Sequence, residues 1–262
     1  MRQMIAFLFL AVFFFSCYSG KAENTAPVFS PPANIPPVLI DRLGAEKNQF
    51  VSELNALIAS DGDNLLVLAD KTHPLPALFV PPLLVPLVSG RSYTIGRDGL
   101  SLRKAAADSL EKMAAAARKD GITLLASSSY RSYAYQKTVY ERNVLELGKE
   151  KADRESARPG TSQHQLGTAV DFGSITDAFA RTASGVWLSL NAGRFGWSLS
   201  FPDGYEKVTG YRWECWHYRY IGVEGASFQK KWFADIQQYM LEYIDAWKKF
   251  DTSRQTAGTV SE

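Results

Sequence analysis

The sequence has 262 residues, of which 29 are basic and 27 acidic, so its formal net charge is +2. Charges of both signs are interspersed, and this pattern excludes the basic stripe or tail that is typical of nucleic-acid binding. The length allows one well-filled domain or two small ones. We therefore expect a monomer that does not bind nucleic acid.

The N-terminus has the pattern of an export signal. Arg2 precedes an unbroken apolar run over residues 5–15. This run is shorter than the roughly 20 residues that a membrane-spanning helix needs, and small and polar residues follow it. Cys17 comes directly after a serine, as in bacterial lipoprotein signals, although Phe14 stands where leucine is usual. We predict a lipoprotein signal peptide over residues 1–17, a lipid on the cysteine, and a location in the bacterial cell envelope, lipid-anchored or periplasmic. Simple cleavage nearby and an uncleaved anchor are the alternatives.

Composition divides the rest of the chain. Residues 18–45 are rich in Pro, Ala, Asn and Ser, and closely spaced prolines favour an extended backbone. We predict a flexible tether over 18–45, a folded domain over 46–250 and a disordered tail over 251–262.

The first half of the expected domain is mainly helical. Apolar residues recur every three to four positions over 102–119, which predicts an amphipathic helix. A buried strand is expected over 122–127. A second helix follows over 133–147, with Ser132 in position to cap it.

The second half combines short strands with helices. Strands are expected over 168–172, 197–201 and 213–221, with a short helix over 186–192. The pattern over 226–249 predicts one long amphipathic helix. Large apolar residues follow one of its faces, and we interpret this stripe as core packing: Phe228, Trp232, Ile236, Tyr239, Tyr243 and Trp247. Together these elements predict an α+β fold with a small antiparallel sheet and flanking helices.

Two polar clusters contain two of the three histidines of the chain. The first cluster holds His164 and Asp171, and the second holds Glu214 and His217. Two imidazoles and one carboxylate would leave one position of a tetrahedral zinc site open to water. The other carboxylate could then act as general base, because zinc lowers the pKa of bound water. The clusters predict a zinc hydrolase, and an ordinary structural role for each residue is the alternative.

This hypothesis sets a condition on the local backbone. Glu214 and His217 are three positions apart, so on a flat strand they would face opposite sides of the sheet. They can share a site only if the glutamate lies in the turn before the strand or at a bulge. In the first cluster, Gly167 is expected to provide the turn between the histidine and the aspartate.

The remaining histidine and the second cysteine carry no comparable signal. His73 lies in a proline-bounded loop without neighbouring ligand types, so we interpret it as a surface or packing residue. Cys215 has no free histidine to activate it if the clustered histidines bind metal. We interpret it as a small packing residue.

The clusters and their flanking segments resemble the VanY-type D-alanyl-D-alanine carboxypeptidase family, zinc peptidases that trim peptidoglycan stem peptides. The matching segments occur in family order: KTHPL at 71–75, SYRS at 129–132, RPGTS at 158–162 leading into the first cluster, and ECWHYRY at 214–220. The resemblance implies a small α+β zinc fold of the hedgehog and D,D-peptidase type. Gln163 departs from the family pattern, in which an acid is common, and so does the Ser128-Ser129 pair, where Ser-Gly is frequent.

The resemblance also assigns roles to the clustered residues. It implies one Zn²⁺ per chain, bound by His164, Asp171 and His217, with Glu214 as the catalytic base. The implied activity is removal of the C-terminal D-Ala from peptidoglycan stem peptides, with D,D or L,D specificity left open. A cross-bridge endopeptidase and a non-catalytic wall-binding zinc module are the alternatives. The retained base argues against the module.

A carboxypeptidase must also recognise a free terminal carboxylate. Arg131 is the candidate, because a guanidinium can bind a carboxylate through two parallel hydrogen bonds. The sequence leaves open whether it binds that carboxylate or the oxyanion of the transition state. Ser162 and Gln136 are expected to hydrogen-bond the peptide. Tyr130 is expected to line the pocket, with a packing role as its alternative.

Overall fold

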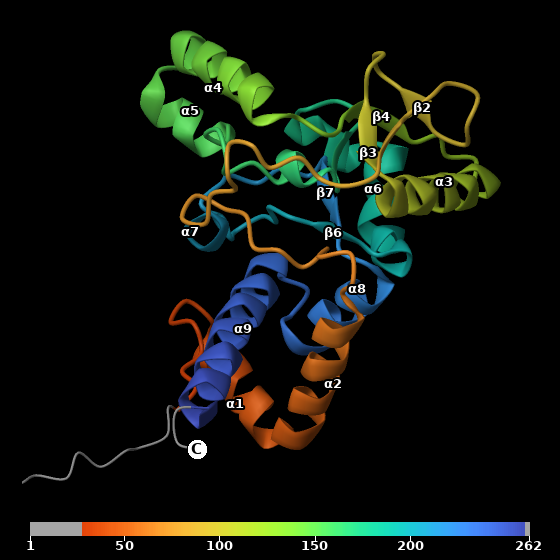
Figure 1. Cartoon of the computed structure of the whole chain (residues 1–262). Helices are drawn as coiled ribbons and strands as arrows, with labels where there is room; N and C mark the ends of the chain where they lie inside the picture. The colour runs from red at the N-terminus through yellow and green to blue at the C-terminus, as the bar shows by residue number, and fades with distance from the viewer. Residues whose placement is uncertain (1–27, 260–262) are drawn as a thin grey trace, which may run out of the picture.

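The structure of the protein is a computed structural model that describes residues 28–259 (Figure 1). Its main sheet has five strands in the spatial order β2-β4-β5-β7-β6. The strands are β2 (Thr94–Ile95), β4 (Leu125–Ser128), β5 (Ala169–Phe172), β6 (Trp197–Leu199) and β7 (His217–Tyr220). All pairings in this sheet are antiparallel except β2 with β4, which is parallel. A separate antiparallel pair joins β1 (Leu84–Pro86) to β3 (Ser101–Arg103).

Helices surround the sheet and form a second layer below it. The α-helices are α1 (Pro37–Ala45), α2 (Lys47–Ser60), α3 (Lys104–Lys119), α4 (Tyr133–Leu147), α5 (Lys149–Glu155), α6 (Ala183–Asn191), α7 (Glu206–Thr209), α8 (Val223–Trp232) and α9 (Gln237–Thr259). Three short 3₁₀ helices complete the fold: η1 (Gln163–Leu166), η2 (Asp177–Arg181) and η3 (Ala192–Phe195). Figure 1 shows α4 and α5 projecting from one end of the molecule and α1, α2, α8 and α9 grouped at the other.

The predicted helix over 102–119 is confirmed as α3, which begins two residues later because residues 101–103 pair with β1. Its apolar side packs against one face of the sheet, where Val170, Phe172 and Tyr218 are buried. Successive side chains of a strand point to opposite faces. Asp171 and His217, which are directly paired across β5 and β7, therefore point to the other face of the sheet.

A second hydrophobic core lies between α1, α2, α8 and α9. The expected stripe of the C-terminal region contributes to it, and aromatic rings from α2 and α8 meet there, with the Phe50 and Trp232 centroids 5.3 Å apart. The interpretation of this stripe as core packing is confirmed. Among residues 28–259, no helix is long and apolar enough to cross a membrane.

The predicted single helix over 226–249 is wrong in one respect, since α8 and α9 are separate. The chain turns between them at Ala234 and Asp235, whose φ angles are 51° and 63°. Gln229 stabilises this turn, because its side-chain amide donates to the backbone oxygen and to Oδ1 of Asp235, each at 2.8 Å. The turn lets Phe233 enter the core with 0% of its surface exposed.

The expected tether and tail also differ from the structure. Helix α1 lies inside residues 18–45, and Ile35 and Leu43 are buried in the second core. Pro37 is compatible with this helix, because the first helical position needs no N–H donor. Helix α9 continues to Thr259, through most of the segment expected to be disordered. The expected signal peptide over 1–17 lies outside the described residues.

Candidate metal centre and its cavity

Three buried side chains from separate elements converge on one point. His164 comes from η1, Asp171 from β5 and His217 from β7, and their ligand atoms all lie within 4.8 Å of one another. Gly167 ends η1 with a φ of 70°, which turns the chain into β5 as the sequence analysis expects. A Cβ atom there would approach Pro81 to 3.0 Å, so the glycine also permits close packing.

The hydrogen bonds of the two histidines leave one nitrogen of each ring facing Asp171. His164 Nδ1 lies 2.7 Å from the Ser129 carbonyl oxygen, and His217 Nε2 lies 3.3 Å from Gln163 Oε1. Both partners are acceptors, so these two nitrogens carry the ring protons. The unprotonated His164 Nε2 and His217 Nδ1 lie 3.2 and 3.1 Å from the two carboxylate oxygens of Asp171.

This arrangement fits a bound cation. A neutral imidazole that donates through one nitrogen presents only a lone pair at the other, so the inner nitrogens face the carboxylate without a proton between them. Asp171 Oδ1 is correspondingly buried without a hydrogen-bond partner. Two nitrogens and a carboxylate oxygen, each ring held by an outer acceptor, form a donor set that suits zinc.

The electrostatics of the site support ligand-ready protonation states. Burial, together with the Arg131 charge, lowers the pKa of His164 to about 4, so its imidazole is neutral at physiological pH. Burial acts to raise the pKa of Asp171. The close approach of His164 and His217 and the Arg131 charge outweigh that effect and hold its pKa well below the usual value. The carboxylate is therefore ionised.

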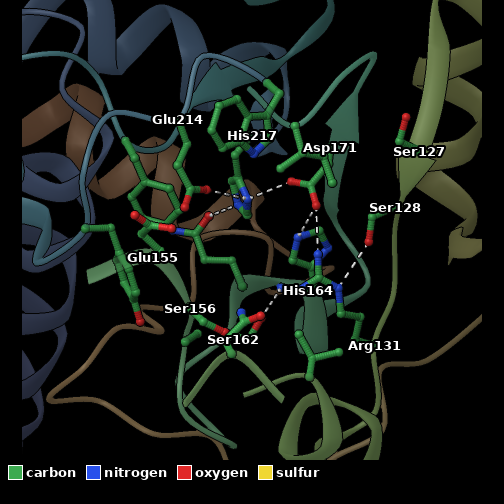
Figure 2. Close-up of a pocket in the computed structure, with 18 of the residues that line it drawn as sticks. Ser127, Ser128, Arg131, Glu155, Ser156, Ser162, His164, Asp171, Glu214 and His217 are labelled. Carbon is green, nitrogen blue, oxygen red and sulfur yellow. Dashed lines mark hydrogen bonds and ion pairs between the residues drawn. The ribbon is translucent and has the colours of Figure 1, made fainter. Parts of the chain in front are cut away.

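Glu214 lies beside these residues because the chain turns before β7. The His217 N–H donates to the Glu214 carbonyl oxygen at 3.1 Å, which closes a turn over the two residues between them. The strand consequently begins at His217, later than expected, and the condition set by the three-residue spacing is met. Glu214 Oε2 lies 3.6 Å from His217 Nδ1, and burial and the Asp171 charge raise the pKa of Glu214 well above its usual value. Figure 2 shows its carboxylate directed toward the histidine.

Arg131 is held by three side chains. Its guanidinium donates to Asp171 Oδ2 at 2.7 Å, to Ser128 Oγ at 3.1 Å and to Gln136 Oε1 at 3.3 Å. A guanidinium has five N–H groups, so these bonds leave N–H groups for a substrate. Gln136 is 1% exposed and also donates to the Ala157 carbonyl oxygen. The structure thus places Gln136 behind Arg131 and not at the cavity wall, because it is committed to these two internal bonds.

The converging residues lie in a cavity of about 400 Å³. Ser162 lines it, together with Arg131 and Glu214 (Figure 2), whereas Tyr130 is not among its lining residues. The half-buried Tyr130 is consistent with its alternative, a packing role. The sequence does not single out several other lining residues, among them Glu155, Tyr211 and Arg212. The last two lie just before Glu214, whereas nothing in the sequence marks Glu155.

Gln163 connects the metal centre to the C-terminal helix. Its Oε1 receives a hydrogen bond from Ser200 Oγ at 2.7 Å besides facing His217 Nε2. Its Nε2 donates to Gln237 Oε1 at 3.2 Å, and Gln237 is the first residue of α9. All three polar partners are buried. Glutamine at position 163, in place of the acid that is common there, therefore still provides an acceptor oxygen for the outer nitrogen of His217.

The two remaining candidates for reactive groups lie outside the metal centre, although His73 has a carboxylate neighbour that the sequence analysis did not consider. His73 Nδ1 lies 2.9 Å from Asp70 Oδ1, and His73 does not belong to the metal-ligating group. Cys215 is buried, and its sulfur lies 3.6 Å from the Thr176 carbonyl oxygen.

Comparison with known proteins matches this site to a family. The model of the VanY D-alanyl-D-alanine carboxypeptidase family matches residues 99–223. The putative carboxypeptidase YodJ of Bacillus subtilis (strain 168) is 37% identical over 194 residues, which are 71% of this chain and 69% of YodJ. The chain belongs to the VanY family.

Solved structures of VanY-type peptidases share the fold. The LdcB LD-carboxypeptidase superimposes with a TM-score of 0.63 at 32% identity, over 70% of this chain and 88% of that one. A variant of the vancomycin resistance D,D-pentapeptidase VanY, solved in complex with Zn(II), gives a TM-score of 0.56 at 30% identity, over 67% of this chain and 98% of that one. The predicted α+β zinc-peptidase fold is confirmed.

Proposed function

We propose that this chain is a zinc-dependent carboxypeptidase that removes the C-terminal D-Ala from peptidoglycan stem peptides, by D,D or L,D cleavage. One observation carries the proposal: the buried His164, Asp171 and His217 group opens into the 400 Å³ cavity beside the carboxylate of Glu214. Membership of the VanY family and the likeness to zinc-bound VanY support the substrate class and the metal.

The residues of the site have distinct roles in this proposal. His164, Asp171 and His217 hold the zinc ion, which when bound supplies a Lewis acid that polarises the scissile carbonyl and lowers the pKa of water. Glu214 takes a proton from the attacking water at its carboxylate and returns it to the nitrogen of the leaving D-Ala. Its position in the cavity wall, close to His217, allows both transfers.

Arg131 supplies positive charge next to the reacting group. Its bonds to Ser128, Gln136 and Asp171 fix the guanidinium before substrate arrives, and such preorganisation is what makes charge stabilisation effective. Its free N–H groups can bind the terminal carboxylate or the developing oxyanion. Ser162 Oγ accepts from the His164 N–H at 3.3 Å, and its hydroxyl proton remains available to the peptide.

Product analysis tests the proposed reaction. The zinc-loaded chain is incubated with purified pentapeptide and tetrapeptide muropeptides and with a cross-linked dimer, and the products are separated and weighed by mass spectrometry. We expect loss of a single terminal D-Ala from a linear stem. Conversion of dimer to monomers would indicate an endopeptidase, and binding without any product would indicate a non-catalytic module.

We also propose that the protein acts as a monomer in the cell envelope, held by a lipid on Cys17 at the end of a signal peptide over residues 1–17. Action on peptidoglycan supports the envelope location, and the apolar run that ends in Ser-Cys supports the lipid. Attachment by two or more acyl chains gives stable anchoring. Cys17→Ser should move the protein from the membrane to the soluble fraction without changing the activity of the purified domain. A wild-type protein that leaves the membrane without detergent, with its N-terminus downstream of Cys17, would contradict the anchor.

A further inference from the structure

The cavity extends away from the metal centre along helix α4. Tyr135, Val139 and Arg142 line this outer part, and their spacing of four and three residues places them on one face of the helix. Arg97, from the loop after β2, also lines this part, with its guanidinium 5.8 Å from the centroid of the Tyr135 ring. The outer cavity thus has an apolar strip bordered by two arginines.

Neither of these arginines has a carboxylate partner. Within the described part of the chain, Arg97 contacts the Tyr135 ring and forms no ion pair, and Arg142 forms neither an ion pair nor a side-chain hydrogen bond. The other two arginines of the cavity differ, since Arg131 is bonded to Asp171 and Arg212 to Asp177. Arg97 and Arg142 therefore present free guanidinium groups to whatever occupies the outer cavity.

We propose that the unpaired Arg97 and Arg142 make the outer cavity an anion subsite, in which either arginine can bind a carboxylate of the stem peptide on the N-terminal side of the scissile bond. This inference rests on the proposed function. A guanidinium matches a carboxylate in shape and charge, and an unpaired one needs no existing bond to be broken first. Arg97 lies at Tyr135, and Arg142 lies seven residues further along α4, which is about 10 Å along the helix axis. Two or three extended peptide residues, at about 3.3–3.6 Å each, cover a similar length, so the two arginines flank a peptide segment of that size.

Two parts of a stem peptide can supply this carboxylate. One is the free α-carboxylate of its γ-linked glutamate, and the other is the second carboxylate of a diaminopimelate at the third position. Amidation removes the charge in either case while leaving the size almost unchanged. The subsite would therefore make the enzyme prefer free-acid stems over amidated ones.

Binding measurements test the subsite independently of turnover. Calorimetry gives Kd for tetrapeptide products that differ only in one carboxylate or carboxamide, at the glutamate in one pair and at diaminopimelate in the other. The wild-type chain should bind the free acid about 2- to 5-fold more tightly in one pair, which identifies the carboxylate. The double variant Arg97→Gln, Arg142→Gln should bind both members equally. The preference of the wild type should weaken at high salt, because exposed charges are screened.

The control is Arg194→Gln, which removes an exposed arginine of η3 that bonds Asn191 and does not line the cavity. It should keep the wild-type preference. An equal preference in the wild type and the double variant, or no preference in the wild type for either pair, would overturn the subsite. A preference in binding without release of D-Ala from any peptide would support the subsite and overturn the proposed function.

Discussion

Replacement of Glu214 by glutamine should separate catalysis from folding. The amide keeps the shape of the side chain in the cavity wall but cannot accept a proton. A general base contributes about 10²–10⁴-fold to rate, which corresponds to about 3–5 kcal/mol of activation free energy at roughly 1.4 kcal/mol per tenfold. We expect the zinc-loaded variant to lose turnover by this factor and to keep its metal, because Glu214 is outside the ligand group.

The same substitution should stabilise the metal-free protein at neutral pH. Burial and the Asp171 charge raise the pKa of Glu214 above its value of 4.5 in the unfolded chain, so the native state holds the proton more tightly. As the pH rises above about 4.5, Glu214 ionises more readily in the unfolded chain than in the native state, so the free energy of unfolding falls. Below that pH this residue has no such cost. Glutamine removes this cost. The metal-free variant should unfold at a higher temperature than wild type at pH 7, with the difference lost at pH 4.

The assay combines three measurements: zinc content, initial rate of D-Ala release, and thermal unfolding of the metal-free protein at both pH values. Glu224→Gln, at an exposed position of α8 outside this cavity, is the matched control. It should leave zinc content and turnover unchanged, and it should not raise the unfolding temperature, because its charge lies in the first turn of the helix. Near-normal turnover in zinc-loaded Glu214→Gln would refute the assignment of the base. A lower unfolding temperature of the metal-free variant at pH 7 would refute the electrostatic reasoning.

Three further substitutions test the metal centre, the cavity and the second core. His217→Ala should abolish stoichiometric zinc binding, whereas His73→Ala should retain it; full zinc in the first variant would show that the ligands are wrong. Arg131→Lys should lower kcat/KM. If this residue binds the terminal carboxylate, amidating the C-terminus of the substrate should lower kcat/KM far more for the wild type than for the variant. Equal losses would indicate that it binds the oxyanion. Hydrogen bonds from Lys231 and an indole N–H of α8 lower the pKa of Glu53 to about 2. Glu53→Gln should therefore destabilise by at most about 1 kcal/mol above pH 5, with the loss fading as the pH falls from 4.5 to 2, and chemical denaturation across this range would reveal any opposite trend.

Periodicity and short motifs predicted the parts of the fold that depend on local sequence. Helix α4 begins at the expected cap, where the Ser132 hydroxyl accepts from the Tyr135 N–H, and the main clusters meet at one centre. The break between α8 and α9 could not be predicted, because neither Ala234 nor Asp235 is a usual helix-ending residue. It depends on side-chain hydrogen bonds from Gln229 to Asp235, and Gln229 is itself held by the hydroxyl of Ser198, on a distant strand.

Other differences arise where a residue type permits two structures. Closely spaced prolines favour an extended tether, but Pro37 also suits the first position of a helix, and the burial of Leu43 decides for α1. In the site, a glutamine near an arginine that lines the cavity can contact substrate or support the arginine. The burial of Gln136 places it in the supporting position. The outer cavity depends on residues far apart in sequence, and its shape is set by the packing of α4.

The bonding of Gln163 to Gln237 bears on where a functional unit of this protein can be cut. The family match ends at residue 223, and a minimal fragment designed from it would contain every candidate zinc ligand. It would lack Gln237, whose Oε1 accepts a hydrogen bond from the side-chain amide of Gln163. Gln163 in turn positions His217, because its Oε1 faces the outer nitrogen of that ring. Such a fragment would also expose the second core, to which α8 and α9 contribute. In this protein the helices beyond the matched segment support the candidate metal centre, and expression designs should retain them.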